Sequence, residues 1–262
     1  MAPSEVAPSE VVEVVEVNGE PATEAALRVP ALSGYGHFTA MQVRDGRVRG
    51  RDLHLARLDS ATRELFGAGL DGERVRELVR HALGDVPDAS VRVYVHWPDG
   101  EKDARVMVTV RPPQTKPVRP HGLMSVPYVR PVPHIKHLGG FGQTHFLRAA
   151  ERAGFDEALL TAPGGLVVEG AITNIAFWDG TSVVWPEAPS LLGITMALLE
   201  PRLPSVRRAV TLADLPSYTS AFLTNSQGFA PVDRIDEVRF TVDTELMGTV
   251  AAAFEAVEWD VI

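Results

Sequence analysis

The sequence predicts an α+β protein, a two-lobed α/β arrangement with a small N-terminal lobe and a larger C-terminal lobe. Segments that alternate polar and apolar residues and segments of helical period follow one another in both halves of the chain. A proline-rich stretch, residues 112–133, separates the two halves. With 262 residues, the chain is long enough to bury a substantial core in one large domain or in two lobes.

Four segments are expected along the chain. Residues 1–12 contain a repeated Ala-Pro-Ser-Glu-Val motif, a composition that favours disorder, and are predicted to be a tail. The small lobe is predicted over residues 13–117 and the larger lobe over 134–262. Residues 118–133 are predicted to connect the lobes, with some strand as the alternative, because the proline-rich stretch holds seven of the chain's 20 prolines.

The elements of the first lobe follow from the spacing of its apolar residues. The helices have apolar residues three and four positions apart, and the strands have them at every second position. Asn18-Gly19 and Asp45-Gly46 are typical of tight turns between strands. The expected order is strands at 11–17 and 38–43, helices at 54–66 and 75–83, and strands at 91–97 and 106–110.

The second lobe is predicted by the same patterns. A helix is expected over residues 143–153, with Gly154 at its C-terminal cap. Gly164-Gly165 and Asp179-Gly180 are predicted hairpin turns. The other elements expected are strands at 157–161, 166–169, 174–178, 182–185 and 219–224, a helix from about 194, and a closing helix at 243–257.

Composition excludes several classes of function. A formal net charge of −9 argues against nucleic acid or an acidic membrane as the main partner. The absence of cysteine excludes disulfides, thiolate nucleophiles and zinc–sulfur sites, and the histidines show no metal-ligand spacing, so no metal is expected. No stretch reaches the ~18 apolar residues of a membrane span, and no signal-peptide pattern is found, so the protein is expected in the cytoplasm.

Lys136 and Glu169 are the residue pair with the clearest chemical meaning. Lys136 precedes a predicted helix, and Glu169 ends a predicted strand 33 residues later. A lysine that forms a Schiff base and a carboxylate that holds a pyridinium nitrogen are what pyridoxal phosphate (PLP) chemistry requires. Taken singly, the lysine is also consistent with a solvated surface charge and the glutamate with a strand end.

Several segments, in the same order and with similar spacing, resemble the fold-type IV PLP enzymes, the class-IV aminotransferases. That family includes branched-chain and D-amino-acid aminotransferases and aminodeoxychorismate lyase. The resemblance covers nearly everything after the tail, and it includes Lys136 and Glu169. The matching segments are residues 17–19, 38–43, 54–58, 136, 154–160, 169–174, 192–195 and 229–232.

The resemblance implies a role for each matching residue. Lys136 would bind PLP covalently and then move the α-proton of the substrate, and Glu169 would pair with the pyridine nitrogen. Arg57 would bind the cofactor phosphate through its guanidinium group, with a helix-surface charge as the alternative. A plain helix start and a polar turn are the alternatives for residues 194–195 and 225–226. The remaining residues implied to bind the cofactor are Asn174, Ile194, Thr195, Asn225 and Ser226.

The chain departs from the family pattern mainly on the substrate side. Phe141 stands where many members have a tyrosine that contacts the cofactor's phenolic oxygen, and Met196 replaces a common arginine. Thr39 and Gln42 also differ from the usual residues. Candidates for substrate binding are Phe38, Gln42, Tyr94 and His96, with core packing as the alternative for the two aromatic residues and for the histidine.

These observations predict a PLP-dependent aminotransferase that moves an amino group between an amino acid or amine and a 2-keto acid. A PLP-dependent lyase of the aminodeoxychorismate lyase type is the first alternative. A divergent homologue of low activity is the second, motivated by Phe141 and Met196. The resemblance also implies a homodimer whose partners are a small-molecule amino donor and a keto-acid acceptor.

Overall fold

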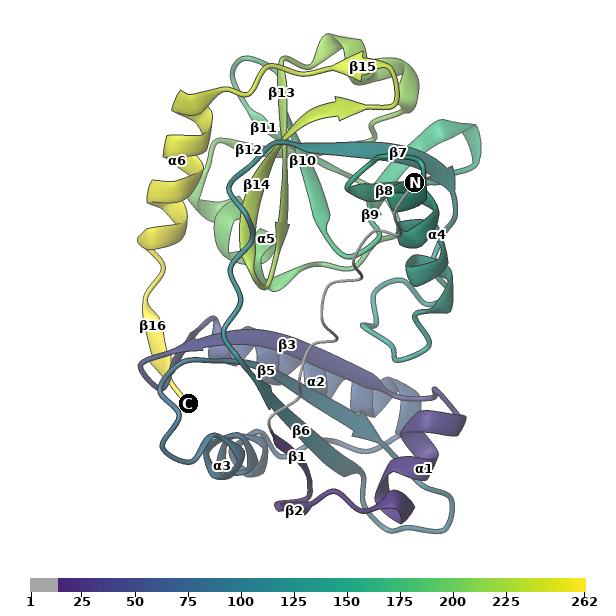
Figure 1. Ribbon diagram of the computed structural model, residues 1–262, viewed down its shortest axis with the longest axis vertical. Helices are drawn as coiled ribbons and strands as arrows, with labels where there is room; N and C mark the ends of the chain where they lie inside the picture. Colours follow the sequence, from purple (N-terminus) through teal and green to yellow (C-terminus); the bar gives the residue numbers. More distant parts are fainter. Residues whose placement is uncertain (1–13) are drawn as a thin grey trace, which may run out of the picture. The chain divides into compact units, whose positions relative to one another are not determined.

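The computed structural model describes residues 14–262, so the expected tail at 1–12 lies outside the described residues. The chain forms two compact units (Figure 1). Unit 1 comprises the described residues up to Gln114 together with Trp259–Ile262, and unit 2 comprises Thr115–Glu258. Each unit has its own sheet, so the mixed α and β content predicted for both halves is found in both.

Unit 1 is a seven-stranded antiparallel sheet in the order β16-β4-β3-β5-β6-β1-β2. Strand β3 carries buried residues at every second position, and the apolar face of the sheet packs against two helices, α2 and α3. The strands are β1 (Val14–Val17), β2 (Glu20–Pro21), β3 (His37–Arg44), β4 (Arg47–Arg49), β5 (Ala89–His96), β6 (Arg105–Arg111) and β16 (Trp259–Val261). The helices are α1 (Glu24–Leu32), α2 (Arg51–Phe66) and α3 (Gly72–Leu83).

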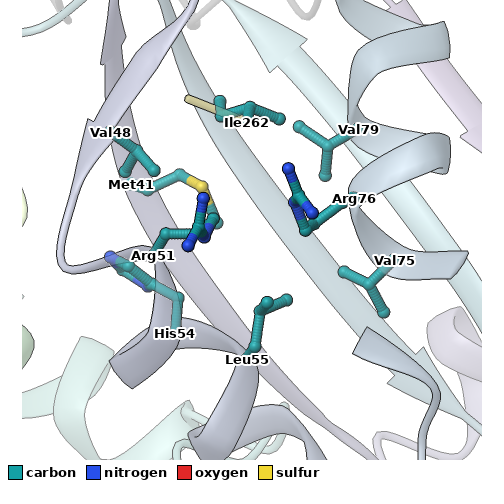
Figure 2. Close-up of a pocket in the computed structure, with 9 residues that line it drawn as sticks. All are labelled: Met41, Val48, Arg51, His54, Leu55, Val75, Arg76, Val79 and Ile262. Atoms are coloured by element: carbon teal, nitrogen blue, oxygen red, sulfur yellow. The ribbon is translucent and has the colours of Figure 1, made fainter. Parts of the chain in front are cut away.

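A small pocket lies in unit 1 between α2, α3 and the sheet (Figure 2). Its lining is mostly apolar, and Arg51 and Arg76 project into it from the two helices. Arg51 donates to the Val261 carbonyl at 3.0 Å, and Arg76 donates to Glu73 at 2.5 Å. Both guanidinium groups therefore have partners within the protein, and no residue predicted for the functional site lines this pocket.

Unit 2 contains a nine-stranded mixed sheet in the order β12-β11-β10-β13-β14-β7-β8-β9, with β15 paired to β14. The pairs β14–β7, β7–β8 and β11–β12 are parallel, and the others are antiparallel. The strands are β7 (His121–Pro127), β8 (Glu157–Ala162), β9 (Leu166–Gly170), β10 (Asn174–Trp178), β11 (Val183–Pro186), β12 (Ser205–Arg208), β13 (Ser220–Asn225), β14 (Gly228–Ile235) and β15 (Val238–Arg239). The α-helices are α4 (Phe141–Arg152), α5 (Ile194–Leu199) and α6 (Thr244–Glu255), and 3-10 turns are at Pro163–Gly165, Glu200–Arg202 and Leu212–Ser217.

Helix ends follow the expected capping chemistry. Asp71 begins α3 by accepting a hydrogen bond from the Glu73 N–H at 2.9 Å, and Asp243 does the same for α6. Helix α4 ends at Arg152 with Ala153 as its C-cap, and the following Gly154 has a φ of 83°. A glycine just after the last turn accommodates this left-handed conformation without strain, which agrees with the cap predicted there.

The observed boundaries differ from the expected lobes at 13–117, 118–133 and 134–262. The stretch expected to connect the lobes contains β7, which pairs with both β8 and β14 inside the second sheet. The strand tolerates proline because Pro120 precedes it and Pro127 is its last residue. At the other end of the chain, Trp259–Ile262 belongs to unit 1, where β16 pairs with β4.

Helix α1 and several strands were not predicted. Pro30 lies inside α1, and an internal proline is a signal against helix, although Thr23 caps the first turn by accepting from the Ala26 N–H at 3.2 Å. Strand β14 was also missed as an element. Its central residues are buried on both faces, so it lacks the alternation by which strands are recognised.

Candidate active site

Lys136 lies half-buried in the loop between β7 and α4, in unit 2. This loop is held by Arg130, whose guanidinium donates to the carbonyls of Pro133 at 3.3 Å and Ile135 at 2.7 Å. Val132, also in the loop, has a φ of 44°, which is a strained conformation for a β-branched residue. The two hydrogen bonds from Arg130 fix the backbone immediately before Lys136 and stabilise this strained segment.

Glu169 lies near the end of β9 and is only 4% exposed. Its carboxylate accepts a hydrogen bond from Arg130 at 3.3 Å through Oε1, and one from the Leu191 N–H at 3.2 Å through Oε2. Arg130 itself is 6% exposed, so the two residues form a buried ion pair. The same arginine therefore links the Lys136 loop to Glu169.

The charges around Glu169 oppose the effect of its burial. Burial raises the pKa of the Glu169 carboxyl, while the positive charges of Arg130 and Lys136 and the Leu191 N–H favour its ionised form. Lys136 is thus close enough to act on the carboxylate electrostatically. A buried charge is costly unless it is paired and hydrogen-bonded, and here the pairing is complete on both carboxylate oxygens.

Asn174 connects β10 to the segment that follows Leu191. Its Nδ2 donates to the Leu191 carbonyl at 2.7 Å. A Cβ added to Gly193 would lie 1.9 Å from Oδ1 of Asn174, so a larger residue here would displace the Asn174 side chain. Because Leu191 also donates to Glu169, the glutamate and the asparagine both hold the same short segment.

The predicted phosphate-binding residues come together at the start of α5. Thr195 donates through Oγ1 to the carbonyl of Asn225 at 2.6 Å, and the Asn225 side chain accepts from the Gln227 N–H at 2.9 Å. Ser226 lies in the same turn, between β13 and β14. The segment 191–195 therefore contacts Glu169 and Asn174 at one end and the turn at 225–227 at the other.

The other predicted residues lie in unit 1. Arg57 is half-buried on α2, and Phe38, Gln42, Tyr94 and His96 lie on β3 and β5. The strand register places those four on the sheet face opposite the helices. The rings of Phe38 and Tyr94 stack with centroids 5.4 Å apart.

Gln42 and His96 differ in their contacts. Gln42 donates to the Ser90 hydroxyl at 3.0 Å and accepts from the Gln114 N–H at 2.9 Å. His96 is completely buried, and neither ring nitrogen has a hydrogen-bond partner within residues 14–262. Burial lowers the pKa of His96, which favours the neutral imidazole.

The burial and contacts of three residues that depart from the family pattern can be described. Phe141 begins α4, is 82% exposed and stacks on His145 with ring centroids 5.8 Å apart. Met196 is buried in the core with Trp185 and Phe222. Thr39 is buried and shares a hydrogen bond with Nδ1 of His54 at 2.6 Å. Met196 and Thr39 therefore have packing roles in their own units.

Arg130 is the site residue that the sequence analysis missed. It lies in the proline-rich stretch that was interpreted as a connection, so it was not considered as a partner for Glu169. The signal was an arginine six residues before the lysine, which is weak by itself. Across residues 14–262, no group of three or more acidic, histidine or cysteine side chains is arranged to hold a metal ion. None of the helices there has the length and apolar character needed to cross a membrane.

Similar proteins were found among solved structures, whereas the curated proteins searched gave no match. A hypothetical aminotransferase from Mycobacterium tuberculosis in its PLP-bound form is 20% identical, with a TM-score of 0.78 and coverage of 93% of this chain and 98% of that chain. The 4-amino-4-deoxychorismate lyase from Pseudomonas aeruginosa is 24% identical, with a TM-score of 0.78 and coverage of 93% and 99%.

The branched-chain aminotransferase from the thermophilic archaeon Thermoproteus uzoniensis, solved with norvaline, is 22% identical, with a TM-score of 0.75 and coverage of 91% of this chain and 92% of that chain. At these identities the solved structures establish the fold. The family model "Amino-transferase class IV" matches residues 36–235, which include Lys136, Glu169 and most of both units. The protein therefore belongs to the class IV aminotransferase family, as the sequence predicted, and the predicted fold and enzyme class are confirmed.

Proposed function

We propose that this protein is a PLP-dependent aminotransferase in which Lys136 carries the cofactor and Glu169 holds its ring nitrogen. The observation that supports this most directly is the buried pair of Arg130 and Glu169, which is joined by the same arginine to the Lys136 loop. PLP, the cofactor of the family, supplies an aldehyde that binds amines and a ring that withdraws electrons from the substrate carbon.

The lysine content of the chain fits this assignment. The sequence contains only three lysines, Lys102, Lys116 and Lys136. Lys102 is exposed in a loop of unit 1, and Lys116 is 6% exposed. Lys136 alone is half-buried on a loop tied to a buried carboxylate, where an amine is accessible and its charge is felt by Glu169.

Each residue of unit 2 has a distinct task in the proposed reaction. Nζ of Lys136 would hold the cofactor and would move the proton of the substrate α-carbon. The Glu169 carboxylate would accept a hydrogen bond from the cofactor's ring nitrogen. Arg130 favours the ionised form of that carboxylate and hydrogen-bonds to the loop of Lys136. Asn174 holds the segment 191–193 against Glu169.

The phosphate group is assigned to Thr195, Ile194, Asn225 and Ser226 of unit 2. Arg57, in unit 1, is a phosphate ligand only by the family resemblance. The support is that the start of α5 and the turn at 225–227 meet through the hydrogen bond between Thr195 and Asn225. Backbone N–H groups, hydroxyls and a guanidinium are the groups that recognise phosphate in proteins.

The substrates proposed are an amino acid or amine and a 2-keto acid. The similar branched-chain enzyme was solved with norvaline, which supports an amino-acid donor. Phe38, Gln42, Tyr94 and His96 remain candidates for substrate binding, since all four lie on one face of the unit 1 sheet. The homodimer and the cytoplasmic location expected from the sequence also stay proposals.

Reduction of the cofactor-loaded protein with borohydride, followed by peptide mapping, tests the assignment. We expect a single labelled peptide that contains Lys136. A label on Lys116, or no label at all, would contradict the proposal. Turnover with and without a 2-keto acid then separates the two activities, because a transaminase requires the acceptor and a lyase of the aminodeoxychorismate type does not.

A further inference from the structure

The turn at residues 170–173 joins two residues of the proposed site. Glu169 comes directly before it, and Asn174 comes directly after it. The turn is closed by a hydrogen bond from the Gly170 N–H to the Thr173 carbonyl at 2.8 Å, and the Ala171 N–H donates to Ala158 at 2.9 Å. The conformation of this turn therefore determines how Glu169 and Asn174 are placed relative to each other.

Glu157, at the start of β8, binds this turn through its carboxylate. Oε1 accepts from the Ile172 N–H at 2.8 Å and from the Thr173 hydroxyl at 2.9 Å. A Cβ added to Gly170 would lie 2.5 Å from the same oxygen and 2.1 Å from the Thr173 hydroxyl. The turn is thus built closely around the carboxylate, and the glycine is required for that approach.

The burial of Glu157 argues that its hydrogen bonds to the turn are not incidental. The residue is 2% exposed, and burying a carboxylate is costly unless donors or an opposite charge compensate. Burial raises the pKa of Glu157, while the buried Lys116 and the donors of the turn favour the ionised form. The backbone N–H of Lys116 in turn donates to Gln227 at 2.9 Å, in the turn assigned to the phosphate.

We propose that Glu157 is a positioning residue of this active site, whose carboxylate fixes the turn at 170–173 and thereby the placement of Glu169 and Asn174. This inference rests on the proposed function, since Glu169 and Asn174 matter only if unit 2 binds the cofactor. Glu157 itself touches neither substrate nor cofactor. Its role is to set the geometry of the groups that do.

Three variants of the full chain test the proposal. Glu157→Ala removes the acceptor of both hydrogen bonds, and we expect PLP to bind about ten- to hundredfold more weakly, as is usual when a supporting partner is lost. Glu157→Gln keeps a carbonyl oxygen for the turn, and we expect it to recover most of this affinity. Thr173→Val removes one donor without changing side-chain size, so we expect a smaller loss, which keeps the test decisive if Glu157→Ala fails to fold.

Asp156→Asn is the matched control. Asp156 is the adjacent carboxylate and accepts from the Gly122 N–H at 2.7 Å, but its hydrogen bonds go to Gly122 and Arg119 and not to the turn. We expect this variant to leave the affinity for PLP and the cofactor absorbance unchanged. The proposal is overturned if Asp156→Asn and Glu157→Ala weaken PLP binding equally. It is also overturned if Glu157→Ala, or Thr173→Val when that variant alone folds, binds PLP like the wild type.

Amide hydrogen exchange of the cofactor-free protein provides a second readout. In Glu157→Ala we expect faster exchange in the peptide that spans residues 170–174 and no change in α6. If amide exchange in that peptide is unchanged, Glu157 does not fix the turn and the proposal is overturned. If the wild type fails to bind PLP, the proposed function is lost, and exchange still reports whether Glu157 fixes the turn, so the two failures are distinguishable.

Discussion

Both units bury histidine and arginine side chains, and unit 2 also contains a buried ion pair. In unit 1 the buried titratable groups include His37 and His96, whose pKa values are both lowered by burial, so both imidazoles are neutral at pH 7. In unit 2 they include the ion pair of Arg130 and Glu169. Imidazole can lose its charge on burial at moderate cost, whereas a buried ion pair must be compensated by geometry.

The difference indicates where the chemistry lies. Nε2 of His37 shares a hydrogen bond with Thr62 at 3.0 Å, within a network that ties β3 to α2. Such contacts stabilise a fold without requiring charge. Buried charges are costly, so their presence in unit 2 needs an explanation other than stability. They lie near Lys136 and near the turn that follows Glu169. Four predictions test this contrast, from the largest expected effect to the smallest.

Loss of the Lys136 amine should abolish activity with little effect on folding. For Lys136→Ala we expect transamination to fall by at least about 10⁴-fold, because the group that binds the cofactor and moves the proton is gone. The free energy of unfolding of the apoprotein should change by less than about 0.5 kcal/mol, since the side chain is half-buried. Initial rates and urea denaturation measure both quantities. Lys102→Ala is the control, and an equal loss of rate in that variant would contradict the assignment.

Breaking the buried ion pair should destabilise unit 2 strongly. Arg130→Leu leaves the Glu169 carboxylate buried without its partner, which costs about 3–5 kcal/mol. The double variant Arg130→Leu/Glu169→Leu should recover most of that loss, because no uncompensated charge remains. A double-mutant cycle from urea denaturation gives the coupling between the two residues. Additive losses would show that the pair is not a coupled unit.

The histidines of unit 1 should make its stability depend on pH. Burial lowers the pKa of His37 to about 4, so the unfolded chain takes up the proton first. The free energy of unfolding therefore falls as the pH decreases from about 6.5 towards 4, by on the order of 3 kcal/mol. Thermal denaturation at a series of pH values should show this slope in the wild type and a reduced slope in His37→Leu. An unchanged slope in that variant would mean that other groups are responsible.

Helix caps should contribute equally to the stability of the two units. Equal contributions would show that the difference between the units concerns buried charge alone. Asp71→Ala in unit 1 and Asp243→Ala in unit 2 each remove a side-chain acceptor at the start of a helix. Each should destabilise its own unit by about 1 kcal/mol. Urea denaturation of both variants measures the effect, and a difference much larger than that between them would point to further contacts of one cap.

Much of this molecule was predictable from local patterns. Five helices and most of the long strands were predicted within a few residues, because apolar spacing and capping residues act over neighbouring positions. Lys136 and Glu169 were recognised because their residue types and the order of the surrounding segments resemble one family. Helix α1 was not predicted, and strand β7 was only an alternative to a connection, because prolines argue against both elements.

The sequence by itself determined the mixed α and β character of both halves, most of the helices and long strands, and the residues that define the family. Only the tertiary structure showed that Arg130 pairs with Glu169, 39 residues away, and that Glu157 holds the turn beyond it. The physical reason is that the tertiary packing of the strands and loops decides which buried charged groups become neighbours. Apolar periodicity records which face of an element is buried, but it carries no information about which polar groups meet there.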